Sequence, residues 1–171
     1  MSGGTGAVSA GRGGEPPRGA AEHGSGAGTA SEGWVLESSL TFAALPTAPA
    51  CGRGHVRLVA HEWGLPGLAD TAELLASELV TNSVQAYERS KLTADPAAVP
   101  VVRLWLASDG LCLAIHVWDA CDDMPARQAA GPDAASGRGL LLVETLGKDW
   151  GAYRQASGKV VWVLISVPGD P

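Results

Sequence analysis

The apolar positions of this chain follow their clearest periodic pattern between residues 70 and 88, and this pattern predicts a long helix. At the helical angle of about 100° per residue, apolar side chains gather into a stripe on one side and a smaller patch on the other. A helix with two apolar sides is expected to be covered on both. Asp70 and Glu73 have the spacing of a capping box, which predicts that the helix starts there. The stripe consists of Ala72, Leu75, Leu79 and Ala86, and the patch of Val80, Val84 and Tyr87.

Shorter patterns before and after this helix predict further helices and several strands. Alternating apolar residues indicate strands, and Asp109-Gly110 between two such runs is a strong signal for a β-hairpin. Gly147 stands where a glycine commonly ends a helix. The order of elements predicts an α+β fold, a two-layer α/β sandwich with helices on one face of a mixed, mostly antiparallel sheet. The expected strands are 34–42, 101–107, 111–118, 150–155 and 159–167, and the other expected helices are 48–63 and 140–146.

Composition divides the chain into a tail and one domain. Residues 1–32 are mostly Gly, Ala, Ser and Pro, with too few large apolar side chains to offset the entropy of ordering, and are expected to form a disordered tail. Residues 33–168 are expected to form a single domain.

The net charge of −6 and the lack of a basic cluster argue against a nucleic-acid partner. No apolar run reaches the roughly 20 residues of a membrane span. No secretory signal is recognised, so a cytoplasmic location is expected.

Two polar residues of the central helix are the first candidates for chemistry. Glu78 and Asn82 are four residues apart, so they project from the same side of the helix, at the edge of its apolar stripe. A carboxylate and an amide bordering a buried surface are costly unless something pairs with them. A hydrated divalent metal with the phosphates of a nucleotide would do so, because Asn82 offers a hard oxygen and Glu78 a base. The alternative is that both residues lie on the solvated side of an ordinary amphipathic helix.

Two further polar sites fall at the ends of apolar elements. Asp119 directly follows an apolar strand, where its carboxylate could accept a hydrogen bond from an exocyclic amine such as that of adenine. Ser136-Gly137-Arg138-Gly139 opens a helix, so its backbone N–H groups are free to bind phosphate. Each signal is weak alone, since an Asp after a strand commonly forms a turn. Many glycine-rich helix starts also bind nothing.

Taken together and in this order, these residues resemble the ATP-binding domain shared by gyrase, the heat-shock chaperone ATPases, sensor histidine kinases and mismatch-repair ATPases, the GHKL superfamily. Glu78-Leu-Val-Thr-Asn82 is similar to its N box, Asp119 to Pro125 to its first glycine box, and Gly137-Arg138-Gly139-Leu140 to its second. Within this superfamily the chain is most similar to the small bacterial anti-sigma-factor serine kinases. Their pattern has an Asp, a Pro a few residues later, and then Ser-Gly-Arg-Gly-Leu.

The resemblance implies the Bergerat ATP-binding fold, with ATP and Mg²⁺ as ligands. It implies that Asn82 holds magnesium, that Glu78 acts as or orients the general base, and that Asp119 reads the adenine. The loop and helix start after Asp119 would close over the nucleotide. The residues that the resemblance assigns to this closing segment are Pro125, Ser136, Gly137, Arg138, Gly139 and Leu140.

The resemblance also implies a function. The chain is expected to be an ATP-binding regulatory protein, a serine/threonine kinase that phosphorylates or switches a partner protein in bacterial transcription control. The expected partners are a sigma factor, an antagonist protein or both. Formation of a homodimer is a further alternative. The first alternative is a non-catalytic, ATP-gated binding module of the same fold, and the second is a structural fold without nucleotide.

Several positions differ from the family pattern. Ala86 stands where many relatives have a histidine, and Val160 where many have a threonine near the phosphates. The loop after Asp119 lacks the glycines of the histidine-kinase box, which argues against a sensor kinase. Nucleotide binding is still expected with these changes, and they bear on the rate of phosphoryl transfer.

Overall fold

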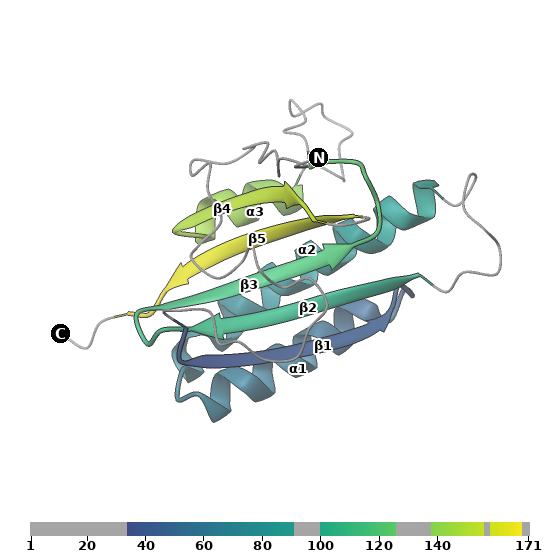
Figure 1. The fold of residues 1–171 in the computed structure, drawn as a ribbon. Coiled ribbons are helices and arrows are strands. Elements are labelled where there is room, and N and C mark those ends of the chain that lie inside the picture. The colour runs from purple at the N-terminus through teal and green to yellow at the C-terminus, as the bar shows by residue number, and fades with distance from the viewer. Residues whose placement is uncertain (1–33, 91–99, 126–137, 156–157, 169–171) are drawn as a thin grey trace, which may run out of the picture.

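A five-stranded sheet carries three helices on one of its faces (Figure 1). The computed structural model describes residues 34–90, 100–125, 138–155 and 158–168. The predicted tail, residues 1–32, lies outside this range. The strands are β1 (Leu36–Ala43), β2 (Val101–Ser108), β3 (Cys112–Asp119), β4 (Asp149–Arg154) and β5 (Lys159–Ser166). The helices are α1 (Ala48–Glu62), α2 (Ala69–Ser90) and α3 (Arg138–Leu146). The α+β architecture and the order of elements predicted from the sequence are confirmed.

The strands lie in the order β1-β2-β3-β5-β4, and each described neighbour pair is antiparallel. The sequence predicted a mixed sheet, so this detail differs. The reason is the path after α3, which leads the chain to the edge of the sheet as β4. The return strand β5 then inserts between β4 and β3 and runs antiparallel to both.

The long helix α2 is buried on two sides, as its two apolar surfaces predict. All four residues of the stripe are buried, and so are Val80 and Val84 of the patch, while Tyr87 is half-buried. The neighbour on the second side is α1. A Cβ at Gly52 of α1 would lie 3.5 Å from Val80 Cγ2 and 3.7 Å from Leu104 Cδ2, so α1 approaches both α2 and the sheet closely there.

The start of α2 differs from the predicted capping box. The helix begins one residue earlier, at Ala69, directly after a 3-10 turn at Pro66–Leu68. Glu73 does not serve as a capping residue, because it accepts hydrogen bonds from Arg57 of α1. The distances are 2.7 Å from Nε to Oε1 and 2.8 Å from Nη2 to Oε2. A two-point contact between a guanidinium and a carboxylate fixes the register of the two helices.

Two predicted glycine positions are confirmed, and only one of them for the expected reason. Gly110 has φ 84° in the turn between β2 and β3, where Asp109 Oδ1 accepts from the backbone N–H of Leu111 at 2.9 Å. Gly147 follows the last residue of α3 as expected, but its φ is not in the left-handed region. A Cβ there would lie 2.6 Å from Val163 Cγ2, so close packing against β5 requires the glycine.

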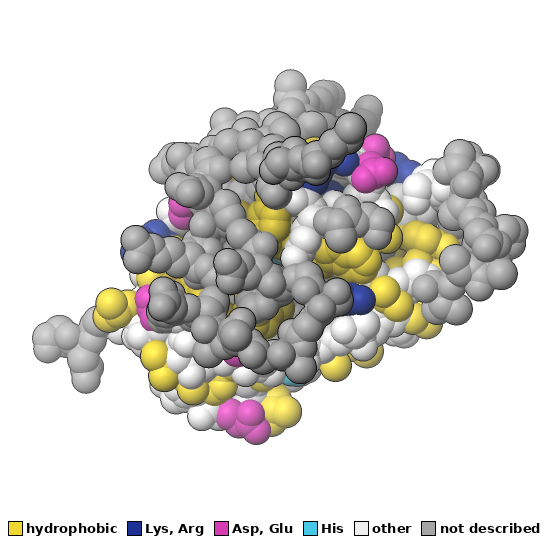
Figure 2. Space-filling view, viewed as in Figure 1, with side chains coloured by type: hydrophobic (Ala, Val, Ile, Leu, Met, Phe, Trp, Pro, Cys, Tyr) yellow, Lys and Arg dark blue, Asp and Glu magenta, His cyan; other side chains and the backbone are white. Residues whose placement is uncertain are grey.

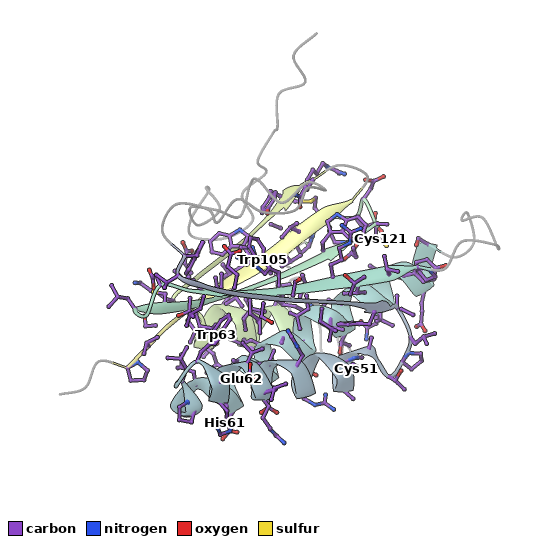
Figure 3. The ribbon with its side chains drawn as sticks, turned by 60° about the horizontal axis from the view of Figure 1, so that its bottom comes forward. Cys51, His61, Glu62, Trp63, Trp105 and Cys121 are labelled. Atoms are coloured by element: carbon purple, nitrogen blue, oxygen red, sulfur yellow. The ribbon has the colours of Figure 1, made fainter. Side chains whose placement is uncertain are left out.

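The face of the sheet turned away from the helices carries a second, aromatic cluster. Tyr153, Val160 and Trp162 are buried there, with Trp118 and Leu164 packed against them. Figure 2 shows hydrophobic side chains on this side of the molecule, and Figure 3 shows Trp105 on the same face. Among the described residues, no helix has the length and apolar character required to cross a membrane.

Candidate functional site

The first half of the candidate site lies where the start of α3 meets the middle of α2. Glu78 and Asn82 are half-buried and face Gly139, the second residue of α3. A Cβ at Gly139 would lie 2.7 Å from Glu78 Oε2 and 3.4 Å from Asn82 Nδ2. Two motifs more than fifty residues apart in sequence are therefore in contact, and a side chain at position 139 would require the carboxylate of Glu78 to move.

The two polar side chains of this half are not paired with any described residue. Within the described part of the chain, Glu78 and Asn82 form no hydrogen bond or ion pair. A half-buried carboxylate and amide without partners are available to bind a ligand. No group of three or more His, Cys, Asp or Glu side chains that could hold a metal occurs among the described residues. A magnesium ion here would therefore take most of its ligands from phosphate and water, with Asn82 supplying a protein oxygen.

The remaining residues predicted for this half are described in part. Arg138 is the first residue of α3, Gly139 is buried, and Leu140 packs partly buried against the main core. Ser136 and Gly137 lie outside the described residues. The prediction that their backbone N–H groups bind phosphate therefore stays a prediction.

The second half of the candidate site is the carboxylate of Asp119, the last residue of β3. It is buried on the helix-bearing side of the sheet, the side on which Val117 joins the main core. Its Oδ1 accepts from Lys159 Nζ at 2.7 Å and from the backbone N–H of Cys121 at 2.9 Å. Its Oδ2 is buried and has no hydrogen-bond partner among the residues that the structure describes. An acceptor in this state is suited to a ligand that donates a hydrogen bond.

Lys159 is the functional candidate that the sequence reasoning missed. The register of the sheet places it directly beside Asp119, in a row with Val102 and Arg154. The preceding Gly158 touches the end of β3, since a Cβ there would collide with the carbonyl oxygen of Asp119. A signal was present, because a lysine that begins an otherwise apolar strand is unusual. Its partner could not be identified without the non-local pairing of β3 with β5.

The segment after Asp119 begins buried and then becomes exposed. Cys121 is buried, and its thiol lies 3.7 Å from the hydroxyl of Ser90 at the end of α2. Burial raises the pKa of this thiol above its ordinary value, so it stays protonated. Figure 3 shows Cys121 near one end of the sheet. Asp122 is exposed and pairs with Arg154 at 3.2 Å, and Pro125 is half-buried.

The two halves lie along the same helix. Asn82 contacts the start of α3, and Ser90, eight residues later, contacts the segment after Asp119. At a rise of 1.5 Å per residue, these positions are about 12 Å apart along α2. This separation is comparable to the distance between the base and the outer phosphates of a nucleotide.

No protein-family model matches the chain, and a comparison with curated proteins finds no match.

Proposed function

We propose that this chain binds Mg-ATP on the helix-bearing side of its sheet, in a Bergerat-type arrangement, and acts as a regulatory protein serine/threonine kinase. The observation that carries the proposal is the contact of Gly139 with Glu78 and Asn82. It brings the three residues that sequence reasoning assigned to the phosphate end of a nucleotide site into one place. The buried, unpaired Oδ2 of Asp119 supports a base subsite toward the other end of α2.

The residues present fit both ligands. The amide oxygen of Asn82 is a hard donor of the kind that magnesium accepts while it keeps its waters. The bound ion would neutralise charge on the phosphates. The start of α3 contributes the positive end of a helix dipole beside Gly139, which favours an anion. Asp119 Oδ2 can accept from the 6-amino group of adenine, whereas the 6-oxo group of guanine would place two acceptors against each other.

Glu78 is placed to assist transfer to a partner's hydroxyl. The hydroxyl oxygen forms a bond to the γ-phosphorus while the bond to the β–γ bridging oxygen breaks, and ADP leaves. The carboxylate of Glu78 takes the hydroxyl proton or orients the group that does. Glu78 lies one helical turn before Asn82. It can therefore face the reacting phosphate without ligating the metal. In the proposed role the partner is a sigma factor or an antagonist protein of bacterial transcription control.

Calorimetry with ATP and GTP, each with and without magnesium, tests the binding proposal. Wild type is expected to bind ATP more tightly with magnesium, and to bind GTP more weakly than ATP. Asn82→Ala should abolish the gain from magnesium, since the protein oxygen of the site is lost. Gln85→Ala is the matched control, because Gln85 is exposed on the same helix. Absence of ATP binding, or an undiminished magnesium effect in Asn82→Ala, contradicts the assignment.

Phosphoryl transfer separates the kinase from the non-catalytic binding module. Glu78→Gln keeps the size of the side chain and removes its basicity. ATP binding should survive, while transfer of labelled phosphate to an antagonist protein from the host falls about 10²–10⁴-fold, the usual contribution of a positioned base. A wild-type protein that binds ATP and transfers no phosphate is the binding module. Equal transfer rates for wild type and Glu78→Gln would make Glu78 a structural residue.

A further inference from the structure

The ion pair between Lys159 and Asp119 uses up only part of its hydrogen-bonding capacity. Both side chains are buried, with 5% and 4% of their surface exposed. The ammonium donates to Asp119 Oδ1 at 2.7 Å and to the carbonyl oxygen of Cys121 at 3.4 Å. The backbone N–H of Cys121 also donates to Oδ1, at 2.9 Å. Among the described residues, Lys159 and the backbone N–H of Cys121 therefore both donate to Oδ1, while Oδ2 is buried without a hydrogen-bond partner.

This one-sided arrangement needs a reason beyond stability. A buried ion pair contributes to stability only when further hydrogen bonds satisfy its remaining atoms, and a buried acceptor without a partner costs free energy. An aliphatic pair of similar volume would pack in the same row without that cost. The arrangement does, however, hold the carboxylate in one orientation. Oδ1 is fixed toward β5 and the turn after β3, and Oδ2 is left to accept a hydrogen bond from a ligand.

We propose that Lys159 is the positioning residue of the base subsite, holding the Asp119 carboxylate so that its Oδ2 is a single acceptor for an exocyclic amino group. This inference rests on the proposed nucleotide binding and goes beyond it by assigning the control of base recognition to Lys159. An ionised Oδ2 can only accept, so it recognises a 6-amino purine. A protonated carboxyl group can donate instead, and it loses that selectivity.

Among the described residues, Lys159 is the one charged side chain that hydrogen-bonds Asp119. On β3 and its continuation the neighbours are the thiol of Cys121, whose raised pKa keeps it neutral, and Asp122, which is exposed and pairs with Arg154, the residue opposite Lys159 on β4. On β2 the residue opposite Asp119 is Val102, and α2 contributes the neutral hydroxyl of Ser90 through Cys121. On β5 the neighbour is Lys159 itself. Removing its charge should therefore leave a lone buried carboxylate that protonates more readily.

The test compares Mg-ATP with magnesium triphosphate, which has the phosphates and lacks the base. The ratio of the two affinities isolates base recognition at each pH. In wild type this ratio is expected to stay constant between about pH 6 and pH 9. In Lys159→Met it should fall about tenfold at the acidic end, the order expected for loss of a charged hydrogen bond, and recover at the alkaline end. The affinity for magnesium triphosphate should be the same in wild type and in Lys159→Met.

The controls separate positioning from structural support. Lys159→Arg keeps the charge and should keep the ratio constant with pH, while Lys148→Met removes an exposed lysine and should behave as wild type. If Lys159→Met does not fold, Lys159→Gln takes its place, and the wild-type ratio is itself decisive. A wild-type ratio that falls toward acidic pH overturns the inference.

Two results distinguish the inference from the proposed function. If wild type binds neither ATP nor triphosphate, the proposed function fails and the inference fails with it. If wild type binds ATP while Lys159→Met gives the wild-type ratio at every pH, or weakens both ligands equally, the inference alone is overturned. The double variant Asp119→Leu/Lys159→Met should bind ATP no better than triphosphate, because it has no base-reading group.

Discussion

Loss of either partner of the Lys159–Asp119 pair should destabilise the fold far more than loss of both. The pair is 2.7 Å long and its side chains are 5% and 4% exposed. Lys159→Met leaves a buried carboxylate without its cation, which costs about 3–5 kcal/mol of the free energy of unfolding. Domains of this size are typically stable by about 5–15 kcal/mol, so the loss is a large share of the total.

The double variant Asp119→Leu/Lys159→Met should recover most of that loss. It replaces two buried charges by apolar side chains of similar length, a change that is often neutral or stabilising by about 1–4 kcal/mol. The position of the pair within the sheet supports this expectation. Its neighbour in the row on β2 is Val102, which is fully buried, so new apolar side chains would continue the existing core.

Urea unfolding followed by tryptophan fluorescence measures both effects. Trp150 and Trp162 are 3% and 2% exposed and should report the loss of tertiary packing. Lys148→Met serves as the control, because Lys148 is exposed and its loss should change the free energy of unfolding by less than about 0.5 kcal/mol. A cost below about 1 kcal/mol for Lys159→Met, typical of surface pairs, would refute the reasoning, since water would then reach the carboxylate.

Two further predictions concern the helices. Gly139→Ala would place a methyl group 2.7 Å from Glu78 Oε2, so the carboxylate must move. Phosphoryl transfer to a partner should fall by up to about 10²-fold, while the free energy of unfolding stays equal or rises by about 1 kcal/mol. An unchanged rate of phosphoryl transfer would contradict the contact. Burial, opposed by the charge of Glu62, lowers the pKa of His55 in α1 below its ordinary 6.5. Neutral His55 therefore contributes its full share to the free energy of unfolding above pH 6.5, and this share is lost as the pH falls through the pKa of His55 in the folded protein. Urea unfolding from about pH 5 to pH 7 should give a smaller slope of stability with pH in His55→Gln, and an equal slope would contradict this.

The elements predicted from local patterns were confirmed because short-range rules produce them. The stripe and patch of α2 are both buried, and Asp109-Gly110 forms the predicted hairpin turn. The details that differed depend on contacts from distant parts of the chain. Glu73 binds Arg57 of another helix, and Gly147 is required by Val163 of β5. Neither contact leaves a periodic signal, so sequence spacing alone suggested the more common local explanations.

The two halves of the candidate site were predictable to different degrees for the same reason. Glu78 and Asn82 are linked by the helical repeat, and only their contact with Gly139 had to come from the fold. Asp119 was identified by its place after a strand, whereas Lys159 reaches it only through the pairing of β3 with β5. The proposed phosphate end thus depends on helix spacing, and the proposed base end on sheet register. A one-residue slip of β5 would move Lys159 to the opposite face of the sheet together with the core residues Val161 and Val163, so the packing of the core fixes the register that brings Lys159 to Asp119. The residue that contacts Asp119 therefore follows from the packing of the whole sheet, which no local pattern in the sequence reveals.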